Sequence, residues 1–254
     1  MKTKTFLRRI STRFPKRLAE SFDHVGLMTG QLPNEIHKVV LCLDMDWELL
    51  PTIKKIMPDI VISHHPFIFG SKYQVFKNDE SKRLLDKEML KLGVPVYSFH
   101  TNFDAGVGGM NDALSEALGL IDVYAPESNS MMRIGELKEA MDIFSFASYA
   151  KHKFDVNYGL LIHDGRPMVK KIGIIGGGGS HDWTIAKDEN CDIYISGDVP
   201  HHVRREIVNA HYNYLDLPHE IEKIFMPTMK KYLLEIDNSL EIYSFDHEKL
   251  PKVI

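Results

Sequence analysis

The sequence predicts an α/β fold in which helices cover the faces of a largely parallel sheet. Short apolar runs with the features of strands alternate with segments of helical periodicity through the first half of the chain. Several of these runs end in histidine or carboxylate residues, and the ligands of open α/β sheets bind at the carboxyl ends of strands. The sequence therefore predicts a sheet together with a site at one of its edges.

The predicted strands are short apolar runs bounded by turn-forming residues. The clearest is Ile60–Ile62, which ends in Ser63 and is followed by two histidines and a proline. A run at Leu240–Phe245 is expected to be a last edge strand. The other strands are expected at Lys38–Leu43, Val94–Phe99, Tyr158–Ile162, Lys171–Ile175, Cys191–Ile195 and Tyr212–Leu215.

The predicted helices follow apolar residues at helical spacing. A patchy pattern over Phe6–Glu20 is interrupted by Pro15. Phe67–Asn78 is expected to be a loop, and Asn78 is expected to cap a helix that Gly93 ends. Further helices are expected at residues 49–56, 111–120, 136–153 and 203–210.

The length suits one large domain or two modest ones, and a change in composition favours two. A chain of 254 residues, 44% of them hydrophobic, can form substantial cores. The composition changes near Ile121. The segment Tyr124–Arg133 is polar and rich in methionine, and we expect it to be a linker or a loop. We expect a first α/β domain formed by residues 1–122 and 213–254, which would bind metal, and a second α/β domain inserted at residues 123–212.

Charge and cysteine content favour a cytoplasmic protein that is not attached to a membrane. The net charge of −4 gives no argument for nucleic acid or for an anionic membrane. No apolar stretch reaches the roughly 18–20 residues that a spanning helix needs. The basic N-terminal segment has no continuous apolar core, so it does not resemble a secretory signal. Cys42 and Cys191 lie in apolar runs and are expected to be buried thiols in a reducing compartment.

Three segments place metal-type ligands at predicted strand ends. Their donors are imidazole or carboxylate groups, and none is a thiolate, which favours zinc, manganese, iron or nickel at a reactive centre over a structural zinc site. Because Pro218 favours the start of a helix, the last two donors, three residues apart, should share one face. The ligands are His64 and His65, His100 and Asp104, and His219 and Glu222.

The adjacent histidines predict two metal ions. Neighbouring side chains of an extended chain point in opposite directions, so His64 and His65 should bind one ion each. Two ions about 3.5–4 Å apart can share a bridging carboxylate. Glu222 is the expected bridge, and Asp104 and His219 are the expected terminal ligands.

The remaining polar residues leave alternatives open. His100 could donate to a ligand carboxylate, act as a catalytic general base, or be a structural strand-end residue. His201 and His202 could contact substrate or form an exposed turn. The glycines of 176–179 lack the G-x-G-x-x-G spacing and are expected to form a tight turn after a strand.

These motifs resemble those of the NIF3-like family, also called DUF34. The matching stretches run from residue 18 to residue 225, and the one that begins at His100 is long and specific. The resemblance implies a NIF3-like fold of two α/β domains with mixed sheets flanked by helices, and a ring-shaped homohexamer. The stretches are LAESFDHVGL, VISHHP, HTNFDAGVGGMNDALSEALGL, IGIIGGGGS, ISGDVPHH and LPHEIEKIF.

The resemblance also implies which residues bind metal. The paired metal site of the family corresponds to the five ligands proposed above, without His100. Some relatives separate the last two ligands by four residues, but Lys223 occupies that position here, so Glu222 is the counterpart. The family usually has Trp and Asn where this chain has Phe22 and His24, a difference that leaves the metal ligands unchanged.

Three functions follow as hypotheses. The first is a hydrolase in which two ions lower the pKa of water and polarise the electrophile. Bacterial members are often labelled GTP cyclohydrolase 1 type 2 homologues, which implies a nucleotide substrate. The alternative is a protein without catalysis, which would bind or deliver metal or act as a regulatory partner. A third, a ring around DNA, disagrees with the acidic net charge.

Overall fold

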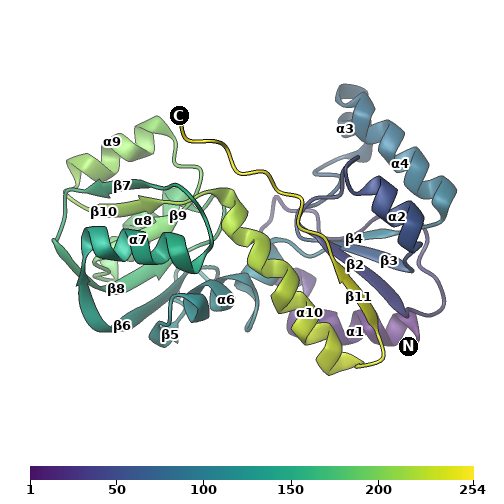
Figure 1. Ribbon diagram of the computed structural model, residues 1–254, viewed down its shortest axis with the longest axis horizontal. Helices are drawn as coiled ribbons and strands as arrows, with labels where there is room; N and C mark the ends of the chain where they lie inside the picture. The colour runs from purple at the N-terminus through teal and green to yellow at the C-terminus, as the bar shows by residue number, and fades with distance from the viewer. The chain divides into compact units, whose positions relative to one another are not determined.

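The computed structural model describes residues 1–254, which form two compact units (Figure 1). Unit 1 comprises Met1–Gly109 and Phe225–Glu248. Unit 2 comprises Met110–Ile224 and Lys249–Ile254. Each unit has its own sheet, so each is described separately.

Unit 1 contains a five-stranded, largely parallel sheet. Its strands are β1 (Gly26–Thr29), β2 (Lys38–Cys42), β3 (Ile60–Ser63), β4 (Val96–Ser98) and β11 (Glu241–Ser244). They lie in the order β1-β4-β3-β2-β11. All neighbours are parallel except β1 and β4, which pair antiparallel. The parallel arrangement predicted for this part of the chain is confirmed, and β11 is the predicted edge strand.

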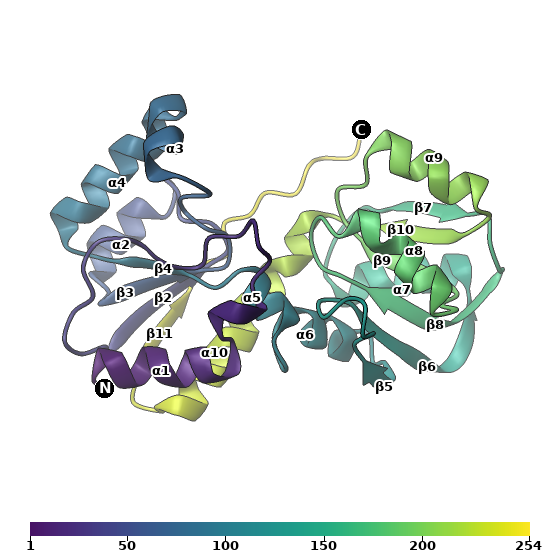
Figure 2. The ribbon, with the colours of Figure 1, turned by 180° about the vertical axis from the view of Figure 1, so that it is seen from behind.

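Helices cover both faces of the sheet in unit 1. They are α1 (Thr3–Arg13), η1 (Lys16–Leu18), α2 (Leu50–Ile56), α3 (Lys72–Asn78), α4 (Glu80–Leu92), α5 (Thr101–Ala105) and α10 (Phe225–Ile236). α2 and α4 lie on one face, whereas α1 and α10 lie on the other (Figures 1 and 2). α1 buries Phe6 and Ile10, four residues apart, and ends before Pro15, as the sequence predicts.

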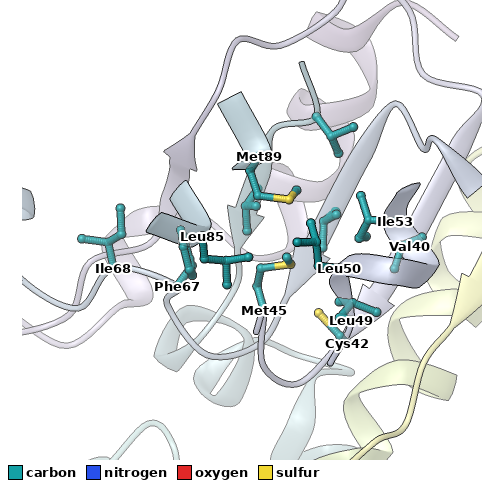
Figure 3. Packing of buried hydrophobic residues seen from close by; sticks show 13 residues of the cluster. Val40, Cys42, Met45, Leu49, Leu50, Ile53, Phe67, Ile68, Leu85 and Met89 are labelled. Atoms are coloured by element: carbon teal, nitrogen blue, oxygen red, sulfur yellow. The ribbon is translucent and has the colours of Figure 1, made fainter. Parts of the chain in front are cut away.

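The core under α2 and α4 is built from aliphatic and sulfur-containing side chains together with Phe67 (Figure 3). Ile53 of α2 and Met89 of α4 are fully buried against Val40 and Val61 of the sheet. Burying such a side chain contributes roughly 1.5–3 kcal/mol. This packing fixes β2, β3 and β4 beneath the two helices and therefore fixes the positions of their carboxyl ends.

Unit 2 contains a six-stranded mixed sheet. Its strands are β5 (Ile121–Tyr124), β6 (Arg133–Asp142), β7 (Leu160–His163), β8 (Met168–Ile174), β9 (Ile193–Ser196) and β10 (Asn213–Asp216). They lie in the order β5-β6-β8-β9-β10-β7. β8, β9 and β10 are parallel neighbours, and the other pairs are antiparallel. The two mixed sheets agree with the fold that the family resemblance implies.

Helices also flank the sheet of unit 2. They are α6 (Met110–Ala117), α7 (Ile143–Lys153), η2 (Ser180–Asp182), α8 (Trp183–Asp188), α9 (His201–Asn209) and η3 (His219–Ile224). α8 and α9 bury Trp183 and Ile207 against Tyr194 and Tyr214 of the sheet. α7 lies on the opposite face (Figures 1 and 2). In neither unit is any helix long and apolar enough to cross a bilayer.

The division into units differs from the one expected at residues 122 and 212. Residues 213–216 are expected in the first domain, but they form β10, which pairs with β9 and β7 of the second sheet. α6, also expected in the first domain, lies in unit 2. The composition change near Ile121 marks a strand within unit 2, because β5 pairs with β6 there.

Three local predictions are wrong. Residues 136–142 were expected to be helical, but they continue β6, which pairs with β8 at both of its ends. This pairing overrides the helix propensity of Glu, Leu, Lys and Ala in that segment. Phe67–Asn78 contains helix α3, and Asp79, not Asn78, caps α4 by accepting a hydrogen bond from Lys82 N.

Candidate metal centre

In unit 1, three histidines lie at the carboxyl ends of neighbouring parallel strands. His64 and His65 follow β3, and His100 follows β4. One ring nitrogen of each of these three histidines lies within 4.8 Å of one nitrogen of each of the others. The expectation that His64 and His65 diverge is wrong, because β3 ends at Ser63 and the chain bends at the two histidines.

The Nδ1 atoms of His64 and His65 are both engaged by acceptors. His64 Nδ1 lies 2.9 Å from the backbone oxygen of Phe99, and His65 Nδ1 lies 2.8 Å from Asp44 Oδ2. Because a carbonyl or carboxylate oxygen only accepts, each Nδ1 carries the proton. In the neutral rings Nε2 then carries the lone pair, which is the form that binds a metal.

Asp104 completes the ligand set of unit 1. It lies in α5, is buried, and places Oδ1 3.6 Å from His64 Nε2. The ligand atoms of a tetrahedral zinc ion, each about 2.0–2.1 Å from the metal, lie about 3.3 Å apart. The observed separation therefore suits two ligands of one ion better than a hydrogen bond. The residues of this cluster in unit 1 fit a divalent metal.

His100 is held by a second carboxylate. Its Nδ1 lies 3.0 Å from Oδ2 of Asp23, whose side chain is fully buried. The same oxygen accepts hydrogen bonds from the backbone nitrogen and the hydroxyl of Thr101. Burial raises the pKa of Asp23, but the hydrogen bonds from His100 and Thr101 outweigh it and lower the pKa to about 2. Asp23 is therefore ionised at neutral pH and presents its negative charge to Nδ1 of His100.

Aromatic rings surround His64. Its ring centroid lies 5.1 Å from that of Phe225 and 6.4 Å from that of Phe103, and these two phenylalanines also contact each other. His64 is fully buried. Such an apolar environment excludes water from one side of the cluster and strengthens electrostatic interactions within it.

Unit 2 contributes a histidine and a carboxylate from a 3₁₀ helix. His219 and Glu222 begin η3, and His219 Nε2 lies 3.0 Å from Glu222 Oε2. A 3₁₀ helix has three residues per turn, so side chains three positions apart eclipse one another. The prediction of a shared face is confirmed, and the spacing of three residues suits this type of helix.

The Nδ1 atom of His219 is also engaged by a carboxylate. It lies 2.6 Å from Oδ2 of Asp198, which follows β9. Asp198 adopts a left-handed backbone conformation with φ of 54°, which is uncommon for a residue other than glycine. The turn therefore presents the Asp198 carboxylate to His219 and leaves Nε2 on the side of Glu222.

The backbone of the glycine run after β8 lies against the Glu222 carboxylate. Gly177 has φ of +63°, and a Cβ there would lie 2.3 Å from Glu222 Oε1. Its carbonyl accepts hydrogen bonds from Gly197 N at 2.7 Å and from the hydroxyl of Ser196 at 3.0 Å. The predicted tight turn is confirmed, and its lack of side chains gives the Glu222 carboxylate room against bare backbone.

His201 and His202 are exposed at the start of α9. The ring of His202 lies 5.8 Å from that of His181, and these residues form no metal-type cluster. Their predicted contact with substrate stays a prediction.

Sequence reasoning missed the three carboxylates that hold the histidines: Asp23, Asp44 and Asp198. For two of them, the position directly after a predicted strand was a signal in the sequence. Asp44 directly follows the strand Lys38–Leu43, and Asp198 follows the strand that ends near Ser196. Carboxyl ends of adjacent parallel strands meet at one edge of a sheet, so these positions could have been grouped with the histidines.

The fold and these side chains define an α/β protein of two units, each of which presents histidine and carboxylate groups at the carboxyl ends of parallel strands. The sequence profile of the Duf34/NIF3 family (NGG1p interacting factor 3) matches residues 1–251. The chain therefore belongs to the DUF34/NIF3 family.

Curated relatives named "GTP cyclohydrolase 1 type 2 homolog" match along nearly the whole chain. The protein from Lactococcus lactis is 30% identical over 256 residues, which covers 99% of this chain and 98% of the relative. The protein from Methanocaldococcus jannaschii is 28% identical and covers 97% of this chain and 100% of the relative.

Solved structures share the fold. Reduced HcgD from Methanocaldococcus jannaschii superposes with a TM-score of 0.79 at 26% identity, covering 96% of this chain and 97% of HcgD. A Bacillus cereus protein related to NIF3 gives a TM-score of 0.87 at 19% identity, covering 100% of this chain and 99% of the other. The NIF3-like fold of two α/β domains is thereby shown.

Proposed function

We propose that the protein is a dinuclear metal-dependent hydrolase that acts on a nucleotide-like substrate. Five residues would hold the two ions: His64, His65 and Asp104 from unit 1, and His219 and Glu222 from unit 2. Neither set alone offers enough donors for two ions, each of which takes at least four ligands including water. The two sets are complementary in chemistry, since all the donors are imidazole or carboxylate groups.

One observation carries this proposal. The Nδ1 atoms of His64, His65 and His219 are each engaged by an oxygen acceptor at 2.6–2.9 Å. Three histidines from two units are thus fixed in the tautomer that binds a metal through Nε2. The exposed His211 shares this tautomer through Asp164. At His64 and His219, by contrast, a carboxylate also lies close to Nε2, and this combination is the one that supports metal ligands.

The reaction that this arrangement supports is the addition of water to an electrophilic centre. Bound divalent ions would supply Lewis acidity and lower the pKa of water. His100 would take a proton from the attacking water at Nε2 and return it to the leaving group, because its Nδ1 lies 3.0 Å from the ionised carboxylate of Asp23. Asp23 would stabilise the resulting imidazolium, as a buried carboxylate beside a catalytic histidine does.

Elemental analysis of the purified protein tests the metal centre. We expect about two ions per chain in the wild type and a loss of metal in both His65→Ala and His219→Ala, although these residues lie in different units. Retention of two ions by either variant would contradict the shared site.

Incubation with GTP tests the substrate class that the names of the relatives suggest. The metal-loaded wild type is expected to release formate, as ring opening by water requires, and His65→Ala is not. Absence of formate above the His65→Ala level, with metal bound, would remove the cyclohydrolase reaction and leave hydrolysis of a phosphoester to be assayed.

Metal delivery is the second candidate, and the exposure of one ligand favours it. The side chain of His219 is 37% exposed and that of Asp198 is 60% exposed, so a chelator or an acceptor protein could reach them. A carrier should release its ions within seconds to a chelator, whereas an enzyme should retain them through dialysis. The rate of metal transfer to a chromogenic chelator distinguishes the two.

The homohexamer implied by the family resemblance stays a proposal for the protein in solution. The edge strand β5 supports self-association, because Ile121, Val123 and Tyr124 are each about 40% exposed there. Light scattering should give about six times the chain mass of 29.1 kDa. A monomeric mass would remove the hexamer without affecting the metal proposal.

A further inference from the structure

The row of polar residues at the edge of the unit 1 sheet extends to a strand that supplies no proposed metal ligand. β11, β2, β3 and β4 are parallel neighbours in that order, so their carboxyl ends meet at one edge of the sheet (Figure 1). Asp44 and Asp46 follow β2, His64 and His65 follow β3, and His247 follows β11. The proposed function gives His247 no role.

The backbone after β11 places the ring of His247. The Phe245 nitrogen donates to the Leu41 oxygen at 2.9 Å, which continues the pairing of β11 with β2. Phe245 packs against the core beneath α2 and α4, and its ring centroid lies 5.6 Å from that of His247. The side chain of His247 is therefore held at the sheet edge, and it is only 9% exposed.

Packing alone does not explain a histidine at this position. Nδ1 of His247 is buried and has no hydrogen-bond partner within the chain. A buried polar atom without a partner lowers the stability of a fold, and a leucine beside Phe245 would avoid that loss. The reason for the histidine must therefore lie at its other ring nitrogen.

Nε2 of His247 faces the loop between β2 and α2. It lies 3.1 Å from Oδ1 of Asp46, an ion-pair contact when the ring is protonated, although it lies off the line of a hydrogen bond. The same oxygen accepts hydrogen bonds from the backbone nitrogens of Glu48 at 2.9 Å and Leu49 at 3.1 Å. Asp46 thus fixes the turn that leads into α2, and His247 lies against the carboxylate that does so.

Asp46 belongs to the same short loop as Asp44, which holds a proposed metal ligand. Oδ2 of Asp44 lies 2.8 Å from Nδ1 of His65. Only Met45 separates the two aspartates, and its side chain is buried in the core beneath α2 and α4. A shift of Asp46 therefore changes the position of Asp44 as well.

Carboxylates of the two segments also lie close enough to interact. Burial raises the pKa of Glu248, and the charges of Asp44 and Asp246 raise it further, whereas the rings of His247 and His65 lower it. An imidazole at position 247 therefore offsets part of the repulsion between the carboxylates of the two segments.

We propose that His247 is a positioning residue of the metal centre, an inference that rests on the proposed metal-binding function. It holds the Asp46 carboxylate and so keeps Asp44 against Nδ1 of His65. It supplies no ligand itself, so its removal changes the affinity for metal without removing a donor.

Competition between the full chain and a chelator for zinc tests this proposal. His247→Leu should weaken zinc binding about 3- to 10-fold, less than the 10- to 100-fold that removal of an orienting residue itself causes. The melting temperature of metal-free His247→Leu should equal or exceed that of the wild type, because a buried unpaired nitrogen is removed. His247→Gln should stay within about twofold of the wild type in zinc affinity, because its amide can donate to Asp46.

His163→Leu is the matched control. The ring of His163 also lies beside a phenylalanine, with its centroid 5.1 Å from that of Phe144, but it belongs to unit 2 and contacts no residue of the Asp44–Asp46 loop. This variant should leave the zinc affinity unchanged.

Two further measurements show whether His247 acts through Asp44. Nitrogen NMR of the metal-free protein, labelled at histidine, reads the tautomer of His65, which should be the Nδ1–H form in the wild type and a mixture in His247→Leu. In the background of Asp44→Asn, His247→Leu should cause no further loss of zinc affinity, because the two changes affect one path.

The outcomes separate the positioning role from the metal centre. Unchanged zinc affinity in His247→Leu, additive losses with Asp44→Asn, or equal losses in His163→Leu would overturn the positioning role and leave the hydrolase proposal intact. A wild type that binds no zinc would remove the proposed metal centre, and the tautomer of His65 would then decide. A mixture in His247→Leu alone would support the positioning role, and the same form in both proteins would overturn it.

Discussion

Asp44 shows how a residue outside the proposed ligand set can determine the state of a proposed metal ligand. Its carboxylate lies 2.8 Å from Nδ1 of His65. Without this acceptor, His65 would be free to place its proton on Nε2 and to rotate, and the lone pair would no longer be fixed. The same relation holds between Asp198 and His219.

We predict that Asp44→Asn weakens metal binding about 10- to 100-fold without unfolding the protein, the usual effect of removing a residue that orients a metal ligand. Competition with a chelator of known affinity measures this change. Asp164→Asn is the matched control, because Asp164 also lies 2.8 Å from a histidine Nδ1, that of the exposed His211. Equal affinities in the two variants would contradict a positioning role for Asp44.

The lowered pKa of Asp23 predicts a specific dependence of stability on pH. Its folded pKa of about 2 lies below the ordinary value of 3.8. The ionised carboxylate therefore stabilises the fold above about pH 4, and this contribution is lost as the pH falls through about 2. We expect Asp23→Asn to lower the free energy of unfolding by about 1–2 kcal/mol at pH 7.

Urea unfolding of both proteins at pH 7 and near pH 2.5 checks this expectation. The difference between wild type and Asp23→Asn should shrink at the lower pH. A difference that stays constant would assign the loss to packing and not to the ionised carboxylate.

At the scale of single residues, the sequence pointed to the proposed metal ligands better than to the residues that hold the histidines in place. The histidines of the His-His-Pro and Pro-His motifs, and the carboxylates near them in the sequence, stand out by residue type. Asp23 does not, because it lies in a loop that no periodicity describes and contacts His100, which is 77 positions further along the chain. Only the family resemblance pointed to that loop, and it did not assign Asp23 a role.

Among the structural elements, the glycine turn after β8 has the most direct effect on the site. Gly177 has a left-handed backbone and lies against Glu222 and His219. Gly178, the next residue, has open space where its Cβ would be. The two positions therefore differ in what a methyl group would displace, although they are neighbours in one loop.

We expect Gly177→Ala to remove metal from the protein and Gly178→Ala to leave the metal content unchanged. The added methyl of Gly177→Ala would displace the Glu222 carboxylate, and its backbone would also be strained by about 1 kcal/mol or more. Elemental analysis together with the melting temperature separates loss of metal from loss of fold. Full metal content in Gly177→Ala would show that Glu222 is not a ligand.

The sequence predicted those helices and strands that a local apolar pattern determines. It failed where backbone pairing between distant strands determines the secondary structure. β3 and β4 are continuous apolar runs, so their burial on both faces was readable. β6 contains Glu136–Met141, which favours a helix by propensity, yet backbone pairing with β8 and β5 makes it a strand. Such pairing is set by residues far along the chain, and a single window of sequence does not contain it.

For the whole molecule, the proposed ions should connect metal content to stability. A ligand that binds only the folded state at 100 times its Kd adds about 2.7 kcal/mol. We predict that chelation lowers the melting temperature and that readdition of the metal restores it. In His219→Ala, chelation should change the melting temperature little, because the donors of unit 2 are already incomplete.

Calorimetry of the two proteins, each with and without chelator, measures these four melting temperatures. A chelation effect of the same size in His219→Ala and in the wild type would place the stabilising ion outside the proposed ligand set.

The native thiols have a practical consequence. Cys42 and Cys191 are both unpaired and buried, and burial raises the pKa of Cys42 well above 9 and that of Cys191 to about 12. Both should resist maleimide and methanethiosulfonate reagents at neutral pH. Cysteines introduced on α4 and α9 could then carry spin labels in an otherwise unaltered chain, and the distance between the labels would report how the two units respond when metal or nucleotide is added.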